Sequence, residues 1–312
     1  MSLETFSYGD HALQTVTVAD LHPAQPLHDA GTGTGTKAGT EAGTEAGTEA
    51  GYWVVLIHGG AWRDPTQTSE SYLTPALEIL RKTSSPTSPL PISRLVSISY
   101  RLSAHPSHPQ DPSTEPTSTL RAAKHPDHLA DVHSALAFLQ TKYKFGSNYV
   151  LVGHSCGATL AFQAVMRGIS PGKEYAAPIG ILGMAGIYDL RLLRDSHRDI
   201  SAYQEFIEGA FGDDEALWDS VSPAVVGGEE GVAGWGNGRV VVLAHSEEDG
   251  LCDLAQSLKM KETLEAWEKN GNEKRKVHSL SIKGEHDEAW EKGEELARGI
   301  VCTVGKLQEL GV

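Results

Sequence analysis

The sequence predicts an α/β fold in which a mostly parallel, doubly wound sheet carries helices on both faces. Short apolar runs alternate with segments of helical periodicity along most of the 312 residues. The apolar runs are continuous, which is typical of central parallel strands that are buried on both sides. A chain of this length can bury the large core of one such domain, so we expect a single domain over residues 1–312.

Six segments are expected to be strands because they are short and rich in aliphatic and β-branched residues. Their ranges are 53–57, 94–100, 148–152, 179–185, 239–244 and 277–282. Five helices are expected at 71–82, 127–143, 156–168, 253–269 and 288–309. The second of these follows a proline and repeats leucine and valine at helical spacing. In such a sheet, ligands bind beyond the carboxyl ends of the strands, so motifs at strand ends carry most weight.

Three segments are expected to lie outside the regular elements. Residues 31–51 form a Gly/Thr/Ala/Glu repeat without an apolar face, which predicts a flexible, low-complexity surface insertion. Residues 82–91 and 103–120 are dense in Pro, Ser and Thr and are expected to be loops. The longer loop is interpreted as either a lid or plain disorder.

Composition excludes several classes of function. Hydrophobic residues make up 39% of the chain, and the net charge of −15 argues against nucleic-acid binding, which requires a basic surface. No apolar run can span a bilayer, and the N-terminus lacks a signal-peptide pattern. Three widely spaced cysteines fit a reducing compartment, so we expect a cytoplasmic protein with no membrane partner. The stretch HPSHPQ is interpreted as a solvated loop, and no metal site is expected.

The segment GHSCG at 153–157 places Ser155 in a sharp turn between a predicted strand and a predicted helix. Small neighbours suit a strained turn that exposes a nucleophilic serine. The pattern G-x-S-x-G also occurs at 168–172, but there it follows a helix. A proline follows that second serine and cannot donate a backbone N–H, so we interpret the segment as a helix-ending loop. The strand-to-helix context favours Ser155.

A catalytic serine requires a base and an acid that orients the base. In α/β-hydrolases these residues follow the serine in the order acid, then histidine. Asp249 and His286 each follow a predicted strand in that order. Asp249 competes with Glu247, Glu248 and Asp253 in the same acidic loop, which is otherwise a solvated face. We favour Asp249 because it lies a few residues beyond the strand and opens the next helix.

The segment HGGAW at 58–62 follows the first predicted strand. A Gly-Gly turn lets backbone N–H groups approach the oxygen that becomes negative during acyl transfer. The candidate donors are the N–H groups of Gly59, Gly60, Ala61 and Cys156. His58 is expected to orient this loop, and Trp62 is expected to form a wall of the pocket. The thiol of Cys156 is interpreted as packing, because its side chain should point away from the pocket.

Seven segments together resemble the kynurenine formamidase (arylformamidase) family, in particular its fungal form: HGGAWRDP, SYRLS, GHSCGA, GIYDL, SPA, HSEEDGL and EHDEAW. The resemblance extends from about Trp53 to the C-terminus, and H-G-G-x-W is its most specific element. It implies an α/β-hydrolase fold and a homodimer. It also implies cofactor-free hydrolysis of N-formyl-L-kynurenine to L-kynurenine and formate, the second step of tryptophan degradation.

By position, the resemblance implies that Ser155 is the nucleophile, Asp249 the acid and His286 the base. It implies oxyanion donors at Gly60 and Ala61, joined by the N–H of the residue after the serine. Trp62 and Tyr100 are candidates to cover the aromatic ring of the substrate. Two alternatives stay open: a generic carboxylesterase of the same fold, and an inactive hydrolase fold that serves as a binding module.

Overall fold

The structure is a computed structural model, and it describes residues 3–22, 51–85, 87–169, 174–271 and 273–312. The predicted insertion at 31–51 lies outside these residues except for its last residue. The end of the second G-x-S-x-G match, at 170–172, also lies outside them.

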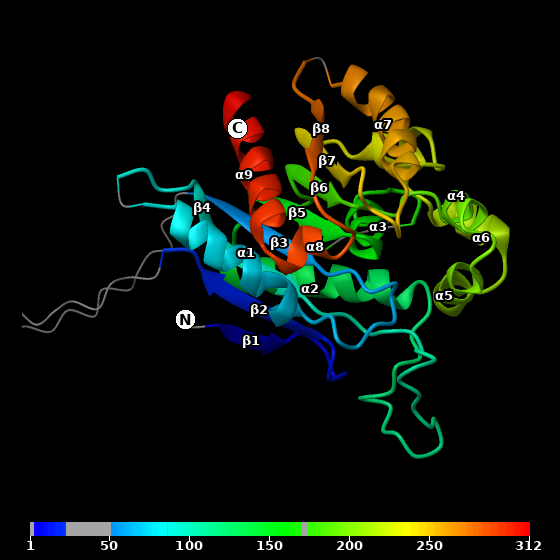
Figure 1. The fold of residues 1–312 in the computed structure, drawn as a ribbon. Helices are drawn as coiled ribbons and strands as arrows, with labels where there is room; N and C mark the ends of the chain where they lie inside the picture. Colours follow the sequence, from blue (N-terminus) through cyan, green and yellow to red (C-terminus); the bar gives the residue numbers. More distant parts are fainter. Residues whose placement is uncertain (1–2, 23–50, 86, 170–173, 272) are drawn as a thin grey trace, which may run out of the picture.

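One eight-stranded sheet runs through the molecule in the order β1-β2-β4-β3-β5-β6-β7-β8 (Figure 1). The strands β3 to β8 are mutually parallel, whereas β2 pairs antiparallel with both β1 and β4. The bounds are β1 Glu4–Ser7, β2 Thr15–Asp20, β3 Tyr52–Ile57, β4 Ile92–Ile98, β5 Tyr149–His154, β6 Gly180–Met184, β7 Val240–Ser246 and β8 Lys276–Ile282. The predicted class, a mostly parallel sheet, is confirmed.

All six predicted strands form, with ends that differ by one or two residues, but β1 and β2 were not predicted. The strand β1 has four residues and is largely exposed, so it has little apolar pattern to detect. The strand β2 reads TVTVAD and is buried at four consecutive positions. Its β-branched content is the signal that could have revealed it.

Helices cover both faces of the sheet, as predicted. Alternate residues of β3 point to opposite sides: Val55 belongs to one apolar cluster and Val54 to the other. The first cluster packs against α2 (Asp127–Tyr143), α3 (Cys156–Gln163) and α7 (Leu254–Lys269), and the second against α1 (Ser69–Thr83) and α9 (Glu294–Glu309). Among the described residues, no helix combines the length and apolar character that crossing a bilayer requires.

The predicted helix at 288–309 is in fact two helices, α8 (Glu288–Glu291) and α9, separated at Gly293. Gly293 has φ +76°, and a Cβ there would lie 2.4 Å from the carbonyl oxygen of Pro75 in α1. The close approach to α1 therefore breaks the helix at a glycine. The predicted helix at 156–168 is also wrong in extent, because α3 ends at Gln163.

Three short helices between β6 and β7 were not predicted: α4 (Leu190–Ser196), α5 (Ser201–Phe211) and α6 (Glu215–Val221). They lie together at one end of the molecule (Figure 1). Two begin at an aspartate N-cap, with Asp189 accepting from the N–H of Leu192 and Asp214 from that of Ala216. These caps were the available sequence signal for α4 and α6, and the helical spacing of the apolar residues Tyr203, Phe206, Ile207 and Ala210 was the signal for α5.

The strand order reverses at β3, which pairs with β4 on one side and β5 on the other. A crevice forms at such a switch point, outside the carboxyl ends of the strands. The loop at 58–62 follows β3, and Ser155 follows β5. The topology therefore brings the two most informative sequence motifs to neighbouring positions on one edge.

Candidate active site

Ser155 stands in a strained turn between β5 and α3, with φ 54° and ψ −123°. A non-glycine residue in such a conformation costs about 1–3 kcal/mol and persists only where the surroundings impose it. Here the N–H of Ser155 donates to the carbonyl of Met184 (3.0 Å), and its own carbonyl accepts from the N–H of Ile187 (3.2 Å). The turn is thus held from both sides by the last residue of β6 and by the chain that follows it.

The two glycines of this turn are required by close backbone packing. A Cβ on Gly153 would lie 2.3 Å from the carbonyl oxygen of Gly157, and one on Gly157 would lie 2.2 Å from that of Ile57. The start of α3 therefore rests directly on the end of β3. This contact joins the serine turn to the loop at 58–62.

The structure brings Asp249 and His286 together. Asp249 Oδ2 accepts from His286 Nδ1 at 2.8 Å, and Oδ1 accepts from the backbone N–H groups of Leu251 and Cys252, both at 2.9 Å. Burial by itself raises the pKa of Asp249, but the hydrogen bond and charge of His286 and the two backbone donors outweigh it and hold the pKa below its usual value. Asp249 therefore stays ionised at neutral pH beside a histidine of fixed orientation.

The competing acids of the same loop are engaged elsewhere or exposed. Glu248 accepts from the N–H of Gly284, Asp253 lies 3.1 Å from the ring of His197, and Glu247 is exposed. The side chain of Asp249, by contrast, is only 1% exposed. Burial together with two backbone hydrogen bonds distinguishes the acid that faces His286.

Two further histidines support this pair and were not singled out from the sequence. His154 Nε2 bonds to the carbonyl of His286 at 3.0 Å, and burial followed by the charge of His286 lowers the pKa of His154 well below its usual value. His245 bonds to Ser257 and to the carbonyl of Cys252, each at 2.7 Å. Their position at the ends of β5 and β7 was the signal that could have revealed them.

The loop after β3 has an unusual backbone: φ is positive at Gly60 (91°), Ala61 (49°) and Trp62 (59°). At Gly59, a Cβ would lie 2.8 Å from His154 Nδ1 and 3.1 Å from Ser155 Cβ. Only glycine lets this backbone lie against the serine turn. Gly60 and Ala61 line the same cavity as Ser155, which is the placement that backbone donors to a developing oxyanion require.

Trp62 and Tyr100 support this loop from behind, which corrects the expectation that they contact the substrate. Both side chains are 0% exposed, and neither lines the cavity. The N–H of Trp62 donates to Cys156 Sγ at 3.3 Å, and the hydroxyl of Tyr100 donates to the carbonyl of His58 at 3.0 Å. These contacts stabilise the strained conformation of the loop.

His58 and Cys156 are likewise buried parts of the scaffold. The ring of His58 stacks on Tyr100 with 4.5 Å between centroids, and Nδ1 bonds to the carbonyl of Gly59 at 2.9 Å. Burial lowers the pKa of His58 to about 4, so this ring is neutral. Burial raises the pKa of Cys156 to about 11, which leaves a protonated thiol that packs against the loop.

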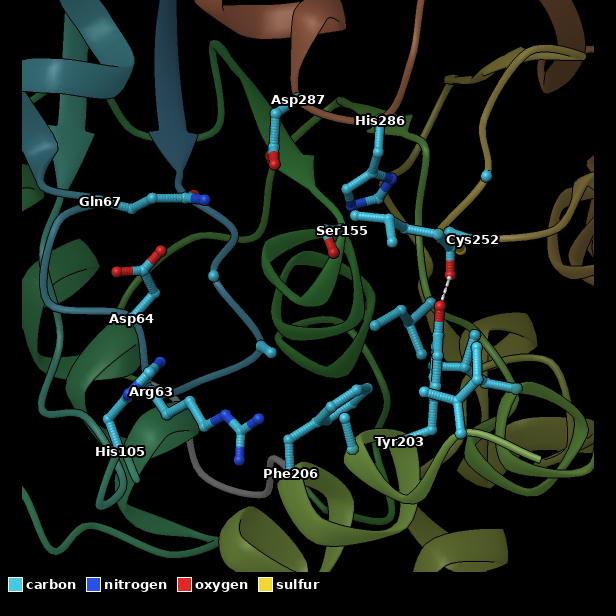
Figure 2. A pocket seen from close by; sticks show the side chains of 18 residues that line it. Arg63, Asp64, Gln67, His105, Ser155, Tyr203, Phe206, Cys252, His286 and Asp287 are labelled. Atoms are coloured by element: carbon cyan, nitrogen blue, oxygen red, sulfur yellow. Dashed lines mark hydrogen bonds between the residues drawn. The ribbon is translucent and has the colours of Figure 1, made fainter. Parts of the chain in front are cut away.

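A cavity of about 390 Å³ opens at this edge of the sheet, and both Ser155 and His286 line it (Figure 2). One wall is apolar and comes from the unpredicted helices and the loop after β7. Its residues are Leu193, Ile200, Ala202, Tyr203, Phe206, Leu251 and Cys252. The opposite wall is polar and carries Arg63, Asp64, Gln67, His105 and Asp287. His105 comes from the predicted loop at 103–120, which contains turns but no helix or strand.

His154, His286 and Asp287 offer ligand atoms within 4.8 Å of one another. Nε2 of His154 and Nδ1 of His286 are already engaged in the hydrogen bonds described above, so each ring has one nitrogen left. Asp287 Oδ1 accepts from the indole N–H of Trp290 at 3.0 Å. Each of the three side chains thus already has a hydrogen-bond partner in the protein: the backbone of His286, Asp249 and Trp290 respectively.

Solved esterases share the fold. The alignment with esterase B of Lactobacillus rhamnosis covers 99% of this chain and 85% of the esterase, with a TM-score of 0.62. The alignment with a carbohydrate esterase from gut microbiota covers 100% of this chain and 97% of that esterase, with a TM-score of 0.59. Both are 14% identical to the chain, so the likeness concerns the fold alone. The protein therefore has the α/β-hydrolase fold.

The more specific assignment comes from sequence relatives. The chain is 43% identical over 264 residues to the kynurenine formamidase-like hydrolase fscH of Fusarium equiseti, which covers 84% of this chain and 85% of the relative. It is 34% identical over 260 residues to kynurenine formamidase avaC of Aspergillus versicolor, covering 78% and 85%. It belongs to this family of kynurenine formamidase-like hydrolases. No family model matches the sequence.

Proposed function

We propose that the protein hydrolyses the formamide of N-formyl-L-kynurenine to L-kynurenine and formate, with Ser155 as nucleophile, His286 as base and Asp249 as the orienting acid. The observation that carries the proposal is the 2.8 Å hydrogen bond between Asp249 and His286, at a cavity that Ser155 also lines. Membership of the family supports the substrate, since the Aspergillus relative bears the name kynurenine formamidase.

The proposed reaction proceeds through a formyl-enzyme. Ser155 Oγ attacks the formyl carbon while its proton passes to His286 Nε2. The carbonyl oxygen becomes negative and accepts from the N–H groups of Gly60, Ala61 and Cys156. His286 then gives the proton to the aniline nitrogen as the C–N bond breaks. Water, deprotonated by the same imidazole, releases formate from the serine ester and restores the hydroxyl.

The ionised carboxylate of Asp249 has two functions in this scheme. It fixes the proton of neutral His286 on Nδ1, so that Nε2 is free to accept the serine proton, and it stabilises the imidazolium that forms. The leaving group is an aryl amine, which departs more readily than an alkyl amine. A site of esterase type is therefore adequate for this amide.

A carboxylesterase is the second candidate, because the fold neighbours are esterases and one wall of the cavity is apolar. Steady-state kinetics on N-formyl-L-kynurenine and phenyl acetate separate the two. We expect a kcat/KM for the formamide well above that for the ester. Ester hydrolysis without formamide turnover would contradict the proposed substrate. Absence of both activities would restore the binding-module interpretation.

Three further expectations accompany the proposal. Turnover without a cofactor predicts full activity after dialysis against EDTA, despite the His154, His286 and Asp287 cluster. The homodimer predicts a mass of two chains in sedimentation equilibrium. The cytoplasmic location stays a prediction that fluorescence microscopy of a tagged chain tests.

A further inference from the structure

The polar wall of the cavity comes largely from one short segment that directly follows the loop at 58–62. Arg63, Asp64 and Gln67 all line the cavity, and Figure 2 shows them on the side opposite Tyr203. A Cβ on Gly60 would lie 2.9 Å from Asp64 Cβ and 3.4 Å from Gln67 Cδ. These two side chains therefore lie against the loop that faces the reacting serine.

This wall holds acceptor atoms for which the described residues supply no donor. The Oε1 atom of Gln67 is buried and, among the residues that the structure describes, has no hydrogen-bond partner. Asp64 accepts from the N–H and the hydroxyl of Thr66 through Oδ1 alone, at 2.8 and 2.7 Å, which leaves Oδ2 for another donor. A buried acceptor without a donor is costly, so a ligand that donates to Gln67 Oε1 is favoured here, and the half-buried carboxylate of Asp64 beside it can accept from the same ligand.

Arg63 supplies the positive charge of this wall. Within the described part of the chain, no acid lies within 4 Å of its guanidinium, which instead sits over the ring of Phe206 at 5.7 Å. Burial lowers the pKa of Arg63, and the charge of Glu205 opposes this. A partly buried guanidinium of this kind is suited to bidentate binding of a carboxylate.

The proposed substrate has the matching chemistry. Its amino acid arm is attached ortho to the formamide nitrogen, so the arm's ammonium and carboxylate return to the neighbourhood of the formyl carbon. Groups that bind the arm must therefore lie beside the loop that holds the oxyanion, not at the far end of the cavity. The segment 63–67 occupies that position, and the apolar wall opposite suits the aromatic ring.

We propose that segment 63–67 is the receptor for the free amino acid arm: Arg63 binds the α-carboxylate, and Asp64 with Gln67 binds the α-ammonium. This inference rests on the proposed function, since it names the groups that select the substrate of the same site. Because the two opposite charges stand on one short segment, the zwitterion can bind in only one orientation. That orientation fixes the formyl carbon in front of Ser155.

The test pairs variants of the enzyme with truncated substrates. Arg63→Met keeps the aliphatic stem over Phe206 and removes the charge. It is measured with N-formyl-L-kynurenine and with N-formylkynuramine, which lacks the carboxylate. We expect kcat/KM for the full substrate to fall roughly 10- to 100-fold, mainly through KM, because a charged hydrogen-bonding partner is lost. The value for N-formylkynuramine should change less than about twofold, since that ligand makes no such contact.

Asp64→Asn tests the binding of the α-ammonium in the same way. It retains the oxygen that accepts from Thr66, so the turn is preserved. It should lower kcat/KM for the full substrate. The value for the desamino analogue, which has the carboxylate but no ammonium, should stay nearly the same. Arg198→Gln is the matched control, because this arginine is exposed between α4 and α5 and does not line the cavity. It should leave both substrates unaffected.

Equal losses on full and truncated substrates would overturn the receptor, because they would show that Arg63 or Asp64 acts through folding or the loop alone. Unchanged kinetics in both variants would overturn it as well. Failure of the proposed function is a separate outcome, in which the wild-type enzyme turns over none of the formamides. Thermal unfolding of each variant identifies any that fail to fold, and Arg63→Lys then serves in place of Arg63→Met with a smaller expected loss.

Discussion

Replacing Asp249 by asparagine tests the proposed acid and base with almost no change in shape. In the wild type, Oδ1 accepts from two backbone N–H groups at 2.9 Å and Oδ2 accepts from His286 at 2.8 Å. An asparagine must keep its single oxygen on the two backbone donors. Its NH₂ group then faces His286 Nδ1 and forces that nitrogen to be the acceptor.

The imidazole of His286 is thereby held as the tautomer with its proton on Nε2, directed at the serine. That form cannot accept the serine proton, and the imidazolium also loses its counter-charge. Serine hydrolases with this exchange lose about 10⁴ in kcat, equivalent to about 5 kcal/mol of transition-state stabilisation. We expect a loss of that order in Asp249→Asn with a modest change in KM.

The assay follows L-kynurenine release by absorbance near neutral pH, with thermal unfolding of each variant alongside. Asp253→Asn is the matched control, since it lies in the same loop but pairs with His197, and it should retain activity within about twofold. If Asp249→Asn retained more than about a tenth of wild-type kcat while folded, the tautomer argument would be refuted.

Three other changes have defined outcomes. Gly157→Ala should lower the free energy of unfolding in urea by about 2–3 kcal/mol, because the new Cβ meets a backbone oxygen at 2.2 Å. Gly305→Ala lies inside α9 with no atom within 4 Å of its Cβ, so it should raise that free energy by about 0.5–1 kcal/mol. Equal effects of the two variants would contradict the packing argument. The unfolding free energy should fall as pH decreases from about 6.5 towards 4. Burial lowers the folded-state pKa of His58 to about 4 and that of His128 to about 3, so the unfolded chain takes up more protons in this range. Denaturant titrations that give the same free energy at every pH would disprove this. Tyr100→Phe removes the 3.0 Å hydrogen bond from the hydroxyl to the carbonyl of His58. It should lower the unfolding free energy by about 1 kcal/mol and lower kcat with little change in KM. An unchanged kcat would show that the loop at 58–62 does not depend on this hydrogen bond.

The sequence patterns were most informative where burial is continuous. The strands β3, β5, β6 and β7 are buried along their whole length, so short apolar runs predicted them. The strand β4 and the edge strand β8 are less buried, and their branched apolar residues predicted them. The positions of Ser155, Asp249 and His286 at strand ends followed from these strands. The edge strand β1 has no such run. The break at Gly293 depends on a contact with α1 that is distant in sequence, which local periodicity cannot show.

The lining of the cavity was the least predictable part of the site. Trp62 lies two residues after Gly60, which suggested a pocket wall, but the residue has a positive φ and its side chain packs in the core against Phe211. The apolar wall comes instead mainly from α4 and α5. The seven residues of α4 are too few to show a clear helical period, whereas the buried residues Tyr203, Phe206 and Ile207 of α5 do follow helical spacing, a signal that was missed. Which side of a loop faces the cavity is decided by backbone conformation, and residue type alone does not specify it.

The central claim is that Ser155 performs formamide hydrolysis. The most direct test is stepwise reaction of the enzyme with a fluorophosphonate. Mass spectrometry identifies the modified peptide, and residual N-formyl-L-kynurenine turnover is measured on the same samples. The account predicts that turnover falls in proportion to phosphonylation of Ser155 and reaches zero when this serine is fully modified. Turnover that persists after complete modification of Ser155, or that is lost with the label on another residue, would contradict it.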